Sequence, residues 1–138
     1  MSNYTIFYSV LSSADVARLA RGGEPWPTGL QKANMGPGFY VWETLADAER
    51  YRARWLEHGV ADLQIIAYRI ANDDLANLRI LDMRNMNDDA INDWMERHSH
   101  YGGDHPLPHG YQHIIRNTGM AAPEHYFSSD VFYLFSEA

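Results

Sequence analysis

The sequence contains no cysteine, and this absence removes three kinds of chemistry at once. A chain without thiols cannot form disulfides, zinc–thiolate centres or a cysteine nucleophile. Basic residues are also few: 11 arginines and lysines face 18 acidic residues, and the formal net charge is -7. Nucleic acids are bound through clustered basic side chains, so this composition argues against a nucleic acid as a partner.

Long apolar runs are missing as well. No stretch approaches the roughly 20 apolar residues that a membrane-spanning helix needs, and the N-terminus lacks the basic-then-apolar pattern of a signal peptide. We therefore expect no membrane partner. The expected location is cytoplasmic where the protein is made, which the absence of cysteine fits, with export that uses no cleaved signal left open.

The residues that are present suffice for one folded domain. The 138 residues are 46% hydrophobic and 13% aromatic, which is enough to build a core. No internal repeat, linker or change of composition divides the chain. We expect residues 1–138 to form a single domain.

The order of the periodic segments predicts an α+β fold with its helices early in the chain. Capping patterns at Ser12, at Thr44 and at Asn87 or Asp88 predict three helices, and residues 73–75 are expected to form a turn. Runs of β-branched and aromatic residues predict strands over residues 5–10, 39–42, 63–70, 78–82, 111–115, 124–127 and 131–135.

One stretch, Gly36-Pro37-Gly38-Phe39-Tyr40-Val41-Trp42, stands out because two glycines flank a proline just before an aromatic run. Glycine lets the backbone turn tightly and pass close to a bound molecule, so a ligand could lie against this segment. A Gly-Pro turn that leads into a buried strand would have the same sequence and needs no ligand.

Three motifs come in a characteristic order. Phe7-Tyr8 closes the first strand before a helix, a Gly-x-Gly-Phe-Tyr strand (residues 36–40) opens the next helix, and Pro123-Glu124 begins a late aromatic strand. Over nearly its whole length the chain resembles the ADP-ribosyltransferase-like superfamily. It is most similar to small bacterial members with a Gly-Lys-Gly-Phe-Tyr motif, and here Pro37 replaces the lysine.

The middle of the chain is similar to that superfamily too. A tyrosine-containing strand (Tyr68), a Leu-x-Ile-Leu-Asp strand (residues 78–82), a tryptophan-bearing helix (Trp94) and a Tyr-x-x-Ile-Ile strand (residues 111–115) follow in the expected sequence. The resemblance implies a split β-sheet that binds NAD, as the substrate, in a cleft.

The resemblance also implies which residues act. The late glutamate corresponds to Glu124 and the second-strand residue to Tyr40. At the first-strand position such families usually carry His or Arg after the aromatic residue, and here Ser9 follows Tyr8. The candidate catalytic residues are thus Glu124, Tyr40 and Ser9, with Tyr8 as the alternative if the motif is shifted. The candidate NAD-binding residues are Tyr8, Gly36, Gly38, Phe39 and Tyr40.

The chemistry requires these residue types. Cleavage of the nicotinamide–ribose bond passes through an oxocarbenium-like state, which the carboxylate of Glu124 could stabilise while it orients the attacking hydroxyl. The ring of Tyr40 could stack on the partly cationic nicotinamide. Without the family pattern, Glu124 would be an ordinary strand-end carboxylate and Tyr40 a core tyrosine.

The expected function is transfer of ADP-ribose from NAD to a macromolecular acceptor, or hydrolysis of NAD, as in a bacterial toxin or effector. An inhibitor protein is a further candidate partner. One alternative is a non-catalytic nucleotide-binding relative, which Ser9 at the first motif would favour. The other is a metal-binding protein, although the histidine spacing is loose and we assign no metal ligand. Its histidines are His98, His100, His105, His109 and His113.

Overall fold

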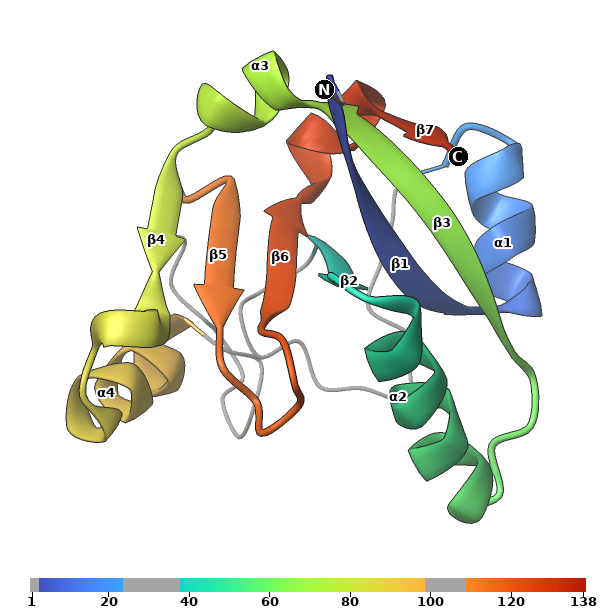
Figure 1. Cartoon of the computed structure of the whole chain (residues 1–138), viewed down its shortest axis with the longest axis horizontal. Helices are drawn as coiled ribbons and strands as arrows, with labels where there is room; N and C mark the ends of the chain where they lie inside the picture. The colour runs from blue at the N-terminus through green and yellow to red at the C-terminus, as the bar shows by residue number, and fades with distance from the viewer. Residues whose placement is uncertain (1–2, 24–37, 99–108) are drawn as a thin grey trace.

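The computed structural model describes residues 3–23, 38–98 and 109–138, which build one seven-stranded sheet with helices on both of its faces (Figure 1). This confirms the α+β class. The helices are α1 (Ser13–Ala20), α2 (Leu45–Glu57), α3 (Asn72–Ala76) and α4 (Asp88–His98), with 3-10 helices η1 (Met83–Asn85) and η2 (Ser129–Leu134). The strands are β1 (Tyr4–Ser12), β2 (Gly38–Trp42), β3 (Leu63–Ala71), β4 (Ile80–Asp82), β5 (His113–Arg116), β6 (Glu124–Ser128) and β7 (Phe135–Glu137).

The strand order is β4-β5-β6-β2-β1-β3-β7, and all neighbours are antiparallel except β4 and β5. β1 pairs with β3 along its whole length, and β2 pairs with β6 from Gly38 to Trp42. Between β1 and β2, in contrast, the described residues contain one register pair, Tyr8 with Trp42. Trp42 is the last residue of β2, and all of β2 pairs with β6 along its other edge. The sheet is therefore continuous but narrowly joined at its centre.

Side chains alternate between the two faces of the sheet, and each face has its own core. The α1 face, covered by α1 and η2, buries Phe7, Phe39, Val41 and Phe127. The opposite face, which we call the α2 face, is covered by α2 and α4. It has two smaller clusters, one around Trp42 and one around Trp94 and Tyr126.

The helix starts follow the predicted caps. The hydroxyl of Ser12 accepts the backbone N–H of Asp15 at 3.2 Å, and the hydroxyl of Thr44 accepts that of Asp47 at 3.1 Å. For α4, the side-chain oxygen of Asn87 accepts the N–H of Ala90 at 2.8 Å. Each oxygen satisfies a donor that the first turn of a helix leaves free.

The predicted C-terminal strand over residues 131–135 is wrong, because most of it forms η2 and only Phe135 enters β7. The hydroxyl of Ser128 donates to the carboxylate of Asp130, and local bonds of this kind favour a turn over an extended chain. The helical spacing lets Val131 and Phe135 reach the same core. β7 then pairs with β3.

Smaller departures affect three other predicted segments. Residues 73–75, expected as a turn, belong to the short helix α3. The strands predicted over residues 78–82 and 111–115 begin two residues later than expected, at Ile80 and His113. Before both strands, the side chain and backbone of Gln112 bond the backbone of Arg79, which holds the two segments together outside the regular ladder.

Gly38 is required by packing within the protein. A Cβ atom there would lie 2.3 Å from the ring of Tyr126 and 2.5 Å from the carbonyl oxygen of Phe127, both on β6. The close approach expected of this glycine is therefore made by a neighbouring strand. Only a residue without a side chain lets β2 lie against β6 in this register.

We predict that Gly38→Ala destabilises the fold by about 2 kcal/mol, which is typical of overpacking in a rigid site. In a domain of this size that loss lowers the melting temperature by roughly 7 °C. Thermal unfolding followed by circular dichroism measures it. An unchanged melting temperature would contradict the close contact between β2 and β6.

Candidate functional site

The three strands that carry the predicted site residues are neighbours in the sheet. Tyr8 on β1 pairs with Trp42 on β2, and Trp42 pairs with Glu124, the first residue of β6. Directly paired residues point to the same face, so all three side chains lie on the α2 face. Tyr40, two residues before Trp42, points to this face as well. Residues from three separate segments of the sequence thus lie next to one another on one face of the sheet.

Glu124 is buried, with 7% of its surface exposed, and its partner is Arg116 on the adjacent strand β5. The guanidinium donates to Oε1 of Glu124 at 3.1 Å. Burial raises the pKa of Glu124, and Arg116 counteracts this in part. The carboxylate is thus held in a setting that disfavours its charge, which is common for groups that take part in reactions.

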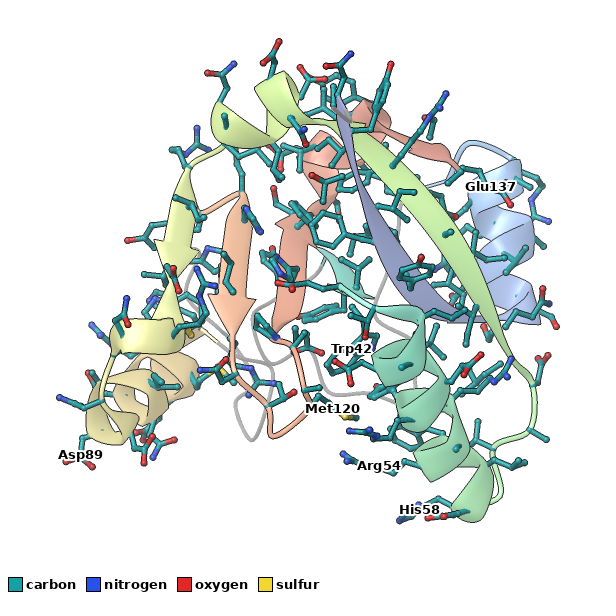
Figure 2. All side chains as sticks on the ribbon, in the orientation of Figure 1. Trp42, Arg54, His58, Asp89, Met120 and Glu137 are labelled. Carbon is teal, nitrogen blue, oxygen red and sulfur yellow. The ribbon has the colours of Figure 1, made fainter. Side chains whose placement is uncertain are left out.

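Helix α2 covers this end of the sheet. The ring of Tyr51 lies 5.3 Å from that of Trp42. Burial, with a smaller contribution from the charge of Glu124, raises the pKa of Tyr51 to about 12, so its hydroxyl stays protonated. Figure 2 shows Met120, from the loop between β5 and β6, close to Trp42 and beside α2. Aromatic groups and one thioether therefore pack around Trp42, the residue that pairs with Glu124.

A second aromatic group adjoins Tyr40. The ring centroid of Tyr40 lies 5.3 Å from that of Tyr126, and the ring centroid of Tyr126 lies 5.7 Å from that of His109. His109 also contacts Trp94 of α4, at 5.1 Å. Flat rings from β2, β6, α4 and the segment before β5 thus gather on the α2 face. Such rings offer stacking surfaces for a planar ligand.

Two of the predicted site residues point the other way. Ser9 follows Tyr8, so it faces the α1 side, where it is buried and its hydroxyl has no hydrogen-bond partner among the described residues. Phe39 lies in the core of the same side, in contact with Tyr68. The structure thus does not bring Ser9 or Phe39 together with Glu124, because neighbours along a strand alternate in direction. Gly36 lies outside the described residues.

The histidines do not converge on a metal site within the described ranges. His98 and His109 lie near each other on the α2 face, with ring centroids 5.8 Å apart. His113 points to the α1 face, where its ring stacks on Phe127. The described residues hold no group of three or more His, Asp or Glu side chains that could bind a metal ion. His100 and His105 lie outside these residues.

An array of polar groups on the α1 face was not predicted. Nδ1 of His125 lies 2.8 Å from Nε2 of His113, and Nε2 of His125 lies 2.5 Å from the carboxylate of Glu43. Both imidazoles are about 95% buried, whereas Glu43 is partly exposed. The carboxylate can only accept, so His125 donates to it and accepts from His113. Two neutral imidazoles satisfy this chain.

Burial governs the titration of both imidazoles. It lowers the pKa of His113 to about 3, with His125 as a smaller cause and Asp82 acting in the opposite sense. Burial also lowers the pKa of His125, although Glu43 opposes the shift. Arg84, paired with Asp82 at 2.7 Å, disfavours a positive charge on either ring. The folded protein therefore keeps this pair neutral.

Comparison of the chain with protein-family models, with curated proteins and with solved structures finds no match. Every helix within residues 3–23, 38–98 and 109–138 is too short or too polar to cross a membrane. The case for a function therefore depends on the geometry of the α2 face.

We predict that the free energy of unfolding falls as the pH drops below about 6.5. Below this pH His113 and His125 bind protons in the unfolded chain but stay neutral in the folded protein, so acid favours unfolding. Each histidine contributes up to about 1.4 kcal/mol per pH unit. Urea unfolding at pH 7.5, 6.5 and 5.5 measures the slope. His113→Leu with His125→Leu should flatten it, whereas replacing the exposed His58 should not. Equal slopes in the wild type and the double variant would exclude this origin.

We also predict that Glu124→Gln is at least as stable as the wild type at pH 7.5, with a gain of up to about 3 °C in melting temperature. The raised pKa means that the ionised carboxylate costs stability above that pKa. Glutamine removes the charge and keeps an acceptor for Arg116. The gain should shrink as the pH falls and Glu124 becomes protonated. Glu96→Gln, at an exposed position of α4, serves as the control. A lower melting temperature for Glu124→Gln would show that the ion pair outweighs burial.

Proposed function

We propose that this protein binds NAD on the α2 face of its sheet and transfers ADP-ribose to a macromolecular acceptor or to water. The observation that carries the proposal is the row Tyr8, Trp42 and Glu124 across β1, β2 and β6, with Tyr40 on the same face. These are the strands that the resemblance to ADP-ribosyltransferase-like proteins marks as NAD-binding. Their adjacency supports a common site.

In this proposal Glu124 acts on the ribose. As nicotinamide leaves, positive charge develops on the sugar, and a carboxylate in a poorly solvated setting stabilises it strongly. The same carboxylate orients the attacking hydroxyl of the acceptor or water. Arg116 holds one oxygen of Glu124 and so fixes its direction.

The two tyrosines hold the donor. The half-buried ring of Tyr40, already in contact with Tyr126, stacks on the nicotinamide. Tyr8 takes the first-strand role, because its side chain lies on the α2 face and that of Ser9 does not. A phenol there hydrogen-bonds a ribose hydroxyl in place of the usual His or Arg. This favours the shifted form of the motif.

The test combines binding and turnover in the same samples. We expect NAD at about 100 times its Kd to stabilise the wild type by about 2.7 kcal/mol, measured as a rise in melting temperature. Nicotinamide release, measured by chromatography, should accompany it. Glu124→Gln should keep the thermal shift and lose release by about 100-fold or more. Tyr40→Ala should lose most of the thermal shift.

Two control variants test whether the effects on NAD binding and nicotinamide release are specific to the proposed site. Tyr133→Ala removes an exposed ring of η2, and Glu96→Gln removes an exposed carboxylate, so both should behave as wild type. A shift without nicotinamide release would indicate a non-catalytic binding module. No shift in the wild type at millimolar NAD would refute the proposal.

A further inference from the structure

Helices α1 and α2 begin with the same local motif. In each, a hydroxyl residue caps the helix, an aspartate follows three residues later, and an arginine follows three residues after that: Ser12, Asp15 and Arg18, and Thr44, Asp47 and Arg50. Asp15 and Asp47 are both buried, with 4% and 1% of their surfaces exposed. A carboxylate at this position is favoured by the partial positive charge of the helix N-terminus.

The two aspartates differ in what they bind. Oδ1 of Asp15 accepts from Arg18 at 2.7 Å, which closes the motif on itself. In α2 the corresponding distance from Asp47 to Arg50 is 3.9 Å, too long for a hydrogen bond. Instead, Oδ2 of Asp47 accepts the backbone N–H of Ala122 at 2.9 Å, across 75 residues of sequence. Of the two aspartates, only that of α2 thus makes a long-range hydrogen bond among residues 3–23, 38–98 and 109–138.

This contact lies just before the candidate catalytic residue. Ala122 is followed by Pro123, whose ring fixes its own φ angle, and then by Glu124. The stretch between the bonded amide and Glu124 is therefore short and stiff. Glu124 also pairs with Trp42, which shortly precedes Asp47 in the chain. The hydrogen bond from Asp47 to Ala122 therefore links the start of α2 directly to the start of β6.

The rest of the loop supports the same placement. Met120 packs against the cluster that contains Trp42 and Ala48, the neighbour of Asp47 on α2. Figure 2 shows Met120 close to Trp42 and beside this helix. The loop from residue 117 to residue 123 is therefore fastened to α2 by one apolar and one polar contact. The apolar contact of Met120 is non-directional, whereas the hydrogen bond to the amide of Ala122 fixes the orientation of the backbone just before Glu124.

We propose that Asp47 is a positioning residue for Glu124: by holding the amide of Ala122, it sets where β6 begins and where the carboxylate of Glu124 points. The inference rests on the proposed function only for the reactive role of Glu124. Displacing a reacting group by about 1 Å can lower a rate by about 100-fold. Asp47 thus acts on the reaction without touching the substrate.

The experiment uses Asp15 as the internal control, because replacing it removes the same helix-start carboxylate far from Glu124. Asp47→Ala and Asp15→Ala should lower the melting temperature by similar amounts. Only Asp47→Ala should lower kcat for nicotinamide release, by about 10-fold or more, with KM for NAD changed by less than about threefold. Asp47→Asn keeps an acceptor oxygen and should restore most of kcat.

Two readouts do not depend on activity. Hydrogen exchange should speed up at the amide of Ala122 in Asp47→Ala and not in Asp15→Ala. The side-chain carboxyl carbon of Glu124, followed by NMR over pH, should titrate at a different pH in Asp47→Ala only. If Asp47→Ala does not fold, Asp47→Glu, which displaces the acceptor by one methylene, takes its place in every measurement.

The outcomes separate the two proposals. A wild type that releases no nicotinamide refutes the proposed function, and the NMR titration and amide exchange then decide the role of Asp47 alone. An unchanged Glu124 titration in Asp47→Ala overturns the positioning role. In an active enzyme, equal kcat values for Asp47→Ala and Asp15→Ala overturn it as well.

Discussion

The pairing of β2 with β6 is the contact on which the rest of this structure depends. It joins residues more than 80 positions apart in sequence and places β6 between β2 and β5. The approach is so close that Gly38 has no room for a side chain against Tyr126. The same ladder ends at Trp42 and Glu124, so the packing constraint at one end and the candidate reactive group at the other share a single register. Stability and site geometry are therefore linked through one pair of strands.

Strand alternation divides the chemistry of the molecule into two faces. Glu124 and His125 are consecutive, yet the first meets Arg116 and the aromatic groups under α2, and the second meets His113 and Glu43 on the side of α1. Both arrangements hold titratable groups in poorly hydrated surroundings, where burial disfavours the charged form of Glu124 and of both imidazoles. A single five-residue strand thus supplies each face with one buried titratable group, Glu124 on one side and His125 on the other.

Local rules predicted the local structure. The caps at Ser12 and Thr44 follow from side chains that bond nearby amides, which sequence spacing displays directly. The choice between Tyr8 and Ser9 could not be made this way, because it requires knowing which of the two side chains lies on the same face of the sheet as Glu124. The bond from Asp47 to Ala122 was equally hidden, since Asp47 has the same local motif as Asp15, which forms no such bond within the part of the chain that the structure describes. For the segment around Val131, aromatic content indicated a strand. The hydrogen bond from Ser128 to Asp130 favours a turn there instead, and a helical turn lets Val131 and Phe135 reach the same core.

The distance in sequence between the members of the row has a consequence for how the protein is made. Tyr8, Trp42 and Asp47 are all synthesised well before Glu124, which pairs with Trp42. Contacts of such long range carry a large loop-closure entropy and form late in folding. A partly synthesised chain can build the β1–β3 ladder and cap its first helices, but it has no reactive carboxylate in place. The chemistry proposed for this fold therefore becomes possible only after Glu124 has been synthesised and has paired with β2.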